Sequence, residues 1–270
     1  MEPSRSTGQG TQPREIDDPR FGGIARLYGK RGLQRLSTAH VCVVGVGGVG
    51  SWTVEALARS GVGTITMVDF DEVCITNVNR QLPALTHTVG SAKVAVLAER
   101  VAQIAPQCAV NARQIFFTAE TEESFFSARY DWVVDAIDVP AQKCLLIAGC
   151  RRRGVPVLSV GGAGGKRDGS AVRVADLALT GRDPLLKVVR RELRREHGFE
   201  SVEGRGFGVP CVYSTEAPVY PWEDGEVCEV REEGGASVRD CSSGFGAATF
   251  VTGVFGFIAA GEVVRRIALD

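Results

Sequence analysis

The sequence has eight cysteines but no two in C-x-x-C spacing. Structural zinc sites of the thiolate type are usually built from such pairs, so we expect no structural zinc. Several of these cysteines fall within strand or helix patterns, where a reduced cysteine acts as a small apolar residue. This usage favours a cytoplasmic location, where thiols stay reduced.

The chain also has almost no net charge and few histidines. The 31 Lys and Arg residues offset 32 Asp and Glu residues and leave a formal charge of −1. A general polyanion binder is therefore excluded, and any nucleic-acid surface has to be a local patch. The three histidines, His40, His87 and His197, are scattered, and none belongs to an obvious Ser-His-Asp set.

Long apolar runs are limited to one segment near the C-terminus. Residues 1–19 are mostly polar, so we expect a disordered tail without the apolar core of a secretory signal. The segment from Phe245 to Gly261 has no charged residue but is rich in Gly and Thr, which favours a buried helix. A membrane span, or a peripheral membrane association, is the alternative.

Strand and helix patterns alternate from residue 20 to about residue 175. A strand at Val41–Val44, a glycine turn, a helix from Ser51 and the strand "TITMVDF" predict a βαβ unit with a right-handed crossover. Continued alternation predicts an α/β fold with a doubly wound, Rossmann-like, mostly parallel sheet that binds ligands at the carboxyl ends of its strands. A C-terminal extension follows, with a basic helix at 182–197, strands and a final helix.

The glycine turn "VGVGGVGSW" predicts a phosphate site. Gly45, Gly47 and Gly50 fit G-x-G-x-x-G between a strand and a helix, and Asp69 ends the next strand. By itself this pattern predicts a dinucleotide such as NAD, with Asp69 on a ribose hydroxyl. The triphosphate of ATP is the alternative ligand.

The polar residues beyond the turn favour ATP. The segment "DFDEVCITNVNRQ" contains an arginine, and "VGSAK" contains a lysine, which suit the charge that grows on departing pyrophosphate. The acid that ends "VVDAID" suits a Mg²⁺ ion that bridges phosphate oxygens. Taken singly, each cation also fits a solvated surface charge. The residues concerned are Asp71, Asn77, Asn79, Arg80, Gln81, Lys93 and Asp138.

These motifs resemble those of the ubiquitin-activating-enzyme-like (ThiF/MoeB-type) adenylylating superfamily over residues 20–165. The resemblance implies that ATP and its metal are bound by residues of the glycine turn and of the segments after it. By the resemblance, the ATP ligands are Gly47, Asp69, Asn79, Arg80, Gln81 and Lys93, and Asp138 is the metal ligand. Their neighbours Gly45, Gly48, Asp71 and Asn77 complete the expected ATP-binding set, and Arg80, Lys93 and Asp138 are the catalytic candidates. The resemblance also implies a homodimer in which an arginine enters the partner's site, and Arg20 and Arg26 are the candidates.

From Arg20 onward the chain is similar to the bacterial tRNA threonylcarbamoyladenosine dehydratases, through "RFGGIARLYG", "CRRRGVPVLSVGGAGG", "CVYSTEAPVYP" and "DCSSGFGAATFVT". The implied reaction uses ATP and Mg²⁺ to close a ring on a modified adenosine beside the anticodon, with a monovalent cation as a further candidate cofactor. The threonyl carboxylate becomes an acyl-adenylate, and the neighbouring carbamoyl group displaces AMP. By this resemblance, residues 20–175 bind ATP, and residues 176–270 support tRNA binding and dimerisation on the same sheet.

A tRNA substrate requires a basic surface. Two stretches supply it, at the end of the helix before residue 154 and along the helix 182–197, although a solvated amphipathic helix is the plain alternative for the second. The tRNA candidates are Arg151, Arg152, Arg153, Lys187, Arg190, Arg191, Arg194 and Arg195. We also expect the glycine-rich loop 198–210 to close over the anticodon arm.

Cys241 in "DCSSGFG" suggests a reactive thiol, because superfamily relatives use a cysteine to accept an activated carbonyl. A buried cysteine at a helix start is the other interpretation. The family resemblance also implies cysteine desulfurase or sulfur-acceptor proteins as partners. Three other functions stay open: adenylylation of a sulfur-carrier or ubiquitin-like protein, NAD-dependent oxidoreduction, and non-enzymatic tRNA binding gated by a nucleotide.

Overall fold

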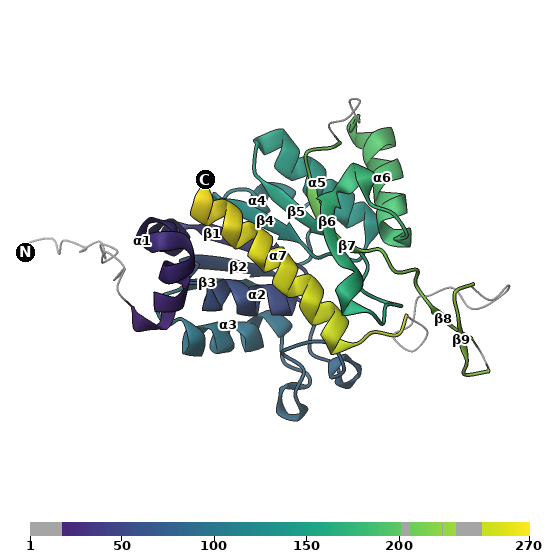
Figure 1. The fold of residues 1–270 in the computed structure, drawn as a ribbon, viewed down its shortest axis with the longest axis horizontal. Coiled ribbons are helices and arrows are strands. Elements are labelled where there is room, and N and C mark those ends of the chain that lie inside the picture. The colour runs from purple at the N-terminus through teal and green to yellow at the C-terminus, as the bar shows by residue number, and fades with distance from the viewer. Residues whose placement is uncertain (1–17, 201–205, 223, 231–244) are drawn as a thin grey trace, which may run out of the picture.

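Seven strands form one sheet in the order β3-β2-β1-β4-β5-β7-β6 (Figure 1). The computed structural model describes residues 18–200, 206–222, 224–230 and 245–270. All neighbouring strands are parallel except β6, which is antiparallel to β7. The predicted doubly wound, mostly parallel sheet is confirmed. Its strands are β1 (His40–Val44), β2 (Thr64–Val68), β3 (Ala109–Arg113), β4 (Trp132–Asp135), β5 (Val157–Val160), β6 (Val172–Asp176) and β7 (Pro210–Ser214).

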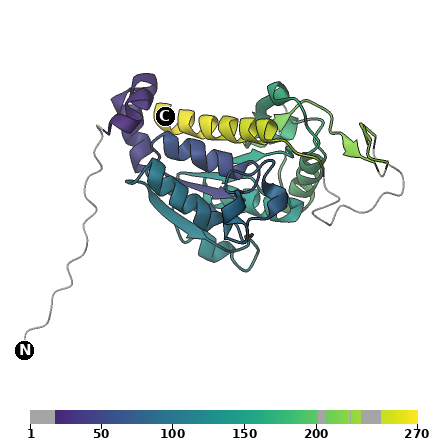
Figure 2. The ribbon, with the colours of Figure 1, turned by 90° about the horizontal axis from the view of Figure 1, so that it is seen from below.

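Helices cover both faces of the sheet, and each face has its own apolar core (Figure 2). The central strands are rich in β-branched residues, which pack well on both faces of a buried parallel sheet. On one face lie α1 (Gly22–Thr38), α2 (Gly50–Arg59), α3 (Lys93–Ile104) and α7 (Thr249–Leu269). On the other lie α4 (Glu122–Phe125), α5 (Pro140–Arg153) and α6 (Pro184–His197).

Short elements complete the chain. A two-stranded antiparallel ribbon of β8 (Tyr220–Pro221) and β9 (Val227–Cys228) stands apart from the main sheet (Figure 1). The 3-10 turns are η1 (Pro19–Phe21), η2 (Ile75–Asn77), η3 (Thr86–Thr88), η4 (Gly169–Ala171) and η5 (Leu177–Leu179). Residues 1–17 of the predicted tail lie outside the described residues, and Pro19 already belongs to η1. The predicted division after residue 175 falls inside β6, and the separate roles of the two parts stay a prediction.

The apolar run near the C-terminus forms α7, which packs lengthwise on α2 (Figures 1 and 2). A Cβ at Gly256 would lie 2.7 Å from the Val49 carbonyl oxygen and from the Trp52 Cβ, so glycine allows this close approach. One side of α7 is buried, as predicted, while Phe250 and Phe257 on the other side are exposed. Among the described residues, no helix combines the length and apolarity that a membrane span needs.

Asp183 joins the carboxyl end of β5 to the start of α6. Its side chain is buried, and its two oxygens accept hydrogen bonds from the amides of Leu186 and Gly162 at 3.0 and 2.9 Å. The first bond caps α6, and the second holds the glycine loop after β5. We expect Asp183→Ala to lower the free energy of unfolding by about 2 kcal/mol, because a helix cap and a buried acceptor are lost together. Urea titration measures this loss, and Asp183→Asn, which keeps one acceptor, should lose less.

Candidate active site

The glycine turn after β1 has a backbone that only glycine permits at two positions. Gly45 has φ +85°, and a Cβ there would lie 2.7 Å from the Ala136 carbonyl oxygen. A Cβ at Gly50 would lie 1.8 Å from the Gly45 carbonyl oxygen. The turn therefore packs against the β4 loop and leads directly into α2, whose first turn has no side-chain cap. Uncapped amides at a helix N-terminus bind anions such as phosphates.

Asp69 ties the end of β2 to this turn. Its carboxylate accepts hydrogen bonds from the Val46 amide at 2.7 Å and the Asp71 amide at 2.9 Å. Burial raises the pKa of Asp69 above its ordinary value, and these two bonds and the charge of Lys93 oppose that rise. A carboxylate has about four acceptor sites, so two remain for a ribose hydroxyl.

Lys93 is the buried cation of the site. It begins α3, is 5% exposed, and its Nζ lies 2.9 Å from the Asp71 carboxylate. The Lys93 amide also donates to the Asp71 carbonyl. Two of the predicted ATP ligands thus form an ion pair with each other at the carboxyl end of β2.

The segment after β2 shows two kinds of polar residue. Asn77 is structural, since its Oδ1 accepts from the Cys74 amide, and Asn79 donates to the Ala247 carbonyl before α7. Arg80 Nη1 donates to the Thr76 carbonyl and to Asn79 Oδ1, at 2.9 and 3.0 Å. Because guanidinium has five N–H donors, Arg80 keeps donors for a ligand.

Gln81 carries a buried acceptor that fits a donor group of a ligand. Its Oε1 is buried and has no hydrogen-bond partner, the only such side-chain atom in the described part of the chain. The Gln81 amide faces the glycine turn, because a Cβ on Gly47 would lie 3.6 Å from its Nε2. Gly48 likewise faces the side chains of Arg80 and Thr252. An unpaired buried acceptor costs about 1–3 kcal/mol, so a donor from a ligand or water is expected here.

Asp138 lies outside β4, which ends at Asp135, and not at the strand end that the sequence predicted. The side chain is exposed in the loop before α5, at the edge of the sheet that carries the glycine turn. No cluster of three potential metal ligands occurs among the residues that the structure describes. One carboxylate still suits Mg²⁺ in a nucleotide site, because that ion takes most of its ligands from phosphates and water.

The sequence did not reveal the buried pair beneath this loop. Asp135 and Lys143 are both fully buried, with Nζ 2.8 Å from Oδ2. Burial raises the pKa of the Asp135 carboxyl, and the charge of Lys143 opposes that rise. The available signal was a lysine on an otherwise apolar stretch of helix, eight residues after the first acid of "DAID".

Most of the predicted tRNA residues lie far from the glycine turn. α5 runs from the carboxyl end of β4 back to the amino end of β5, so Arg151, Arg152 and Arg153 stand far from the glycine turn. α6 begins beside Gly162, and its last turn lies near them, because Arg151 stacks on Phe199, just after α6. Arg152 and Arg153 pair with Glu122, Arg195 pairs with Glu196, and Arg190 donates to Thr180. Lys187, in the first turn, is nearest to the glycine turn, and Arg191 and Arg194 are exposed farther along.

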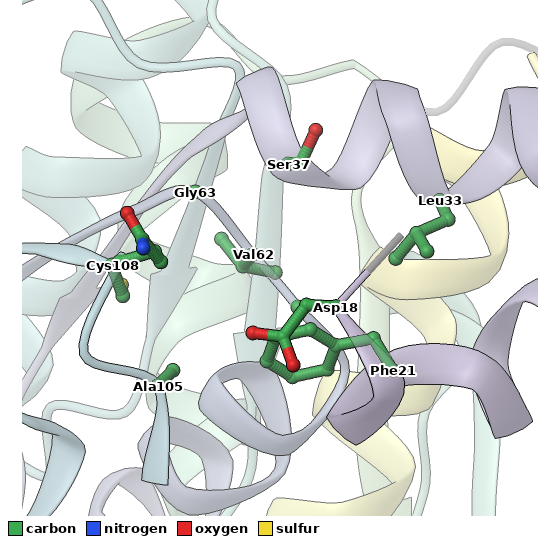
Figure 3. A pocket seen from close by; sticks show the side chains of 10 residues that line it. Asp18, Phe21, Leu33, Ser37, Val62, Gly63, Ala105 and Cys108 are labelled. Atoms are coloured by element: carbon green, nitrogen blue, oxygen red, sulfur yellow. The ribbon is translucent and has the colours of Figure 1, made fainter. Parts of the chain in front are cut away.

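The trans arginine candidates are also distant from the glycine turn of their own chain. Arg20 pairs with Asp18 at 3.0 Å, and Arg26 is exposed on α1. A hollow of about 40 Å³ lies at the amino ends of the strands, lined in part by Phe21, Leu33 and Cys108 (Figure 3). This hollow is far too small for a nucleotide, since ligand pockets measure roughly 300–1,000 Å³. Cys241 and part of the loop 198–210 lie outside the described residues.

Comparisons with known proteins show the family of this chain and the proteins that it resembles. A model of the ThiF family matches residues 23–269. A tRNA threonylcarbamoyladenosine dehydratase of Escherichia coli is 49% identical over 249 residues, which cover 92% of this chain and 93% of that protein. One from Bacillus subtilis is 44% identical over 90% of this chain and 92% of its own. The crystal structure of the E. coli dehydratase in complex with ATP has a TM-score of 0.83, at 45% identity, and covers 94% of this chain and 97% of its own.

Proposed function

Because the chain belongs to the ThiF family, we propose that it is an ATP-dependent tRNA threonylcarbamoyladenosine dehydratase. One observation carries the proposal: a single sheet edge holds the glycine turn, the uncapped start of α2, two cations and an exposed carboxylate. The chain is also similar to such a dehydratase along nine-tenths of its length. That edge suits a triphosphate better than a nicotinamide, which needs a flat apolar slot.

The ATP would lie across the carboxyl ends of β1, β2 and β4. The amides at the start of α2 would bind phosphate oxygens, and Asp69 would accept from the ribose. Arg80 and Lys93 would stabilise the negative charge that develops on departing pyrophosphate. Asp138 would hold a Mg²⁺ ion, which supplies charge neutralisation between phosphate oxygens.

The reaction requires two displacements. The threonyl carboxylate of the tRNA attacks the α-phosphorus, and pyrophosphate leaves. The neighbouring carbamoyl group then attacks the acyl carbon, loses a proton, and AMP leaves. The second step is intramolecular, and well-oriented intramolecular reactions have high effective molarities. It therefore needs orientation more than a base, which fits a site built mainly from phosphate ligands.

Mass analysis of tRNA nucleosides tests this function directly. The purified chain is incubated with ATP, Mg²⁺ and tRNA that carries threonylcarbamoyladenosine. We expect the modified nucleoside to lose the mass of one water, with one AMP released for each conversion. Pyrophosphate exchange driven by a carrier protein with a Gly-Gly tail, and not by tRNA, would instead indicate carrier adenylylation. Binding of tRNA without AMP release would indicate a non-enzymatic scaffold.

We place the stem of the tRNA along α6. A helix of 14 residues is about 21 Å long. An RNA stem that follows it would contact the arginines near its end while the anticodon loop reaches the glycine turn. Leu186, Val189 and Leu193 are buried against the core, and the exposed residues Lys187, Arg191, Arg194 and Arg195 lie on the solvent side of the helix.

Replacing Arg190, Arg191, Arg194 and Arg195 with alanine is expected to weaken tRNA binding about tenfold or more at low salt. Each lost phosphate contact also flattens the salt dependence, by about 0.7–0.9 in the log–log slope. Titrations at two salt concentrations measure both effects. ATP affinity, set at the opposite edge, is the internal control. Wild-type tRNA affinity with an unchanged slope would leave α6 as an ordinary solvated helix.

The functional unit would be a homodimer, because neither Arg20 nor Arg26 approaches the glycine turn of its own chain. A second copy would bring one of them to the triphosphate. From the family resemblance, we also propose a monovalent cation as cofactor and cysteine desulfurase or sulfur-acceptor proteins as partners. The test of the trans arginine mixes Arg20→Ala or Arg26→Ala chains with Lys93→Ala chains. In a mixed dimer, the arginine variant keeps its Lys93 and receives an arginine from its partner. Turnover should therefore recover only for the arginine that acts in trans.

A further inference from the structure

The fully buried ion pair between Asp135 and Lys143 has no role in the reaction above. Asp135 ends β4, and Lys143 lies in the first turn of α5. Asp135 Oδ2 is bound by Lys143 Nζ and by the Ser159 hydroxyl, both at 2.8 Å. Its Oδ1 accepts from the Ile137 amide at 3.3 Å.

The ammonium group of Lys143 also binds the backbone. Besides the carboxylate, Nζ donates to the Ile137 carbonyl at 2.9 Å and to the Asp135 carbonyl at 3.3 Å. All three of its donors are therefore used within residues 135–137. The segment bends around one buried cation, and Asp138 is the next residue.

The same segment supports the glycine turn. The Ala136 amide donates to the Val44 carbonyl at 2.9 Å, and the Ala136 carbonyl faces Gly45 so closely that no Cβ fits there. A shift of residues 135–137 would therefore move both the phosphate-binding turn and Asp138. One buried pair thus lies beneath the two parts of the site that must meet the same phosphates.

Stability alone does not explain the pair. Desolvation of two buried charges offsets much of their attraction, and apolar residues of similar volume often give equal or greater stability. Apolar side chains, however, offer no donor for the two carbonyls, which would lose their partners. The pair is thus suited to imposing one shape on the loop.

We propose that Asp135 and Lys143 are positioning residues that set the distance between the glycine turn and Asp138, and so the binding of metal-complexed ATP. This inference rests on the proposed function of the site. Changes in residues that orient a metal ligand typically cost about 10–100-fold in metal affinity or activity. A loss of that size is expected when the pair is removed.

The test uses Asp135→Asn combined with Lys143→Met, which removes both charges and leaves no unpaired one. Calorimetry measures the ATP dissociation constant at a series of Mg²⁺ concentrations, and thermal melting reports on folding. We expect a folded protein in which Mg²⁺ no longer strengthens ATP binding, as in Asp138→Ala. ATP affinity in EDTA should fall by a smaller factor than the affinity at saturating Mg²⁺, because the shifted turn weakens phosphate binding while the α2 amides remain.

Lys166→Met is the matched control. Lys166 is also a buried lysine whose Nζ binds two backbone carbonyls, those of Glu216 and Arg182, but it lies beyond β5. This variant should lose thermal stability while keeping the wild-type response to Mg²⁺. If the double variant does not fold, Ser159→Ala provides the test, with a weaker effect of roughly threefold to tenfold in the same direction.

The outcomes distinguish a wrong positioning role from a wrong proposed function. A wild-type protein that shows no Mg²⁺-dependent ATP binding would contradict the proposed function itself. If the wild type responds to Mg²⁺ and Asp138→Ala does not, but the folded pair variant or Ser159→Ala responds normally, only the positioning role is wrong. The pair would then be structural.

Discussion

Asp138→Ala is expected to abolish turnover while the protein remains folded. Asp138 is exposed in the loop after β4, and its side chain forms no hydrogen bond or ion pair with a described residue, so its removal costs little folding energy. A metal that neutralises phosphate charge stabilises the transition state and lowers the barrier by several kcal/mol. Loss of about 4 kcal/mol or more slows the reaction at least about a thousandfold. Single-turnover release of AMP from ATP and modified tRNA measures the effect.

Glu99→Ala is a suitable control for Asp138→Ala. Glu99 is also an exposed acid, on α3 and away from the glycine turn. Its loss changes the net charge equally and should leave the rate unchanged. If folded Asp138→Ala releases AMP at the wild-type rate, Asp138 holds no metal that matters to the reaction.

Much of the nucleotide edge could be predicted because local sequence determines it. Gly45 follows a strand and begins a turn that requires positive φ, and this requirement is local. Asp69, Asp71 and Lys93 each border a buried strand or helix, and parallel topology brings such ends to one edge. α6 likewise buries Leu186, Val189 and Leu193, which recur at helical spacing in the sequence.

Other features depend on contacts between distant parts of the chain. Asp135 and Lys143 belong to a strand and a helix whose sequences look apolar, and only the bend of residues 135–137 brings their charges together. Arg151 is far from the glycine turn because α5 runs away from that turn, and the positions of basic residues in the sequence do not reveal this direction. Asn77 Oδ1 accepts from the Cys74 amide, and the contact of Asn77 with ATP stays a prediction. Whether a side chain caps a turn or faces a ligand depends on its rotamer, which spacing does not reveal.

Arg80→Ala and Lys93→Ala are each expected to slow adenylate formation by about 2–4 kcal/mol of barrier, roughly 30-fold to 1,000-fold. Lys93 is 5% exposed, so its charge acts where water screens it little. Its partner Asp71 has a side chain 58% exposed and stays solvated when the lysine is removed, so the fold should survive. Arg80 is held by the Thr76 carbonyl and Asn79, which aims a guanidinium without filling all its donors.

Single-turnover cleavage of saturating ATP with modified tRNA measures the loss, because saturation separates the chemical step from binding. Arg80→Lys should recover only part of the rate, since a lysine lacks the planar fork that binds two phosphate oxygens together. Arg265→Ala is the matched control: Arg265 pairs with Glu262 near the far end of α7 and should not affect the rate. A loss below about threefold in both Arg80→Ala and Lys93→Ala would show that these cations do not meet the triphosphate, because even one preorganised electrostatic contact is worth more than that.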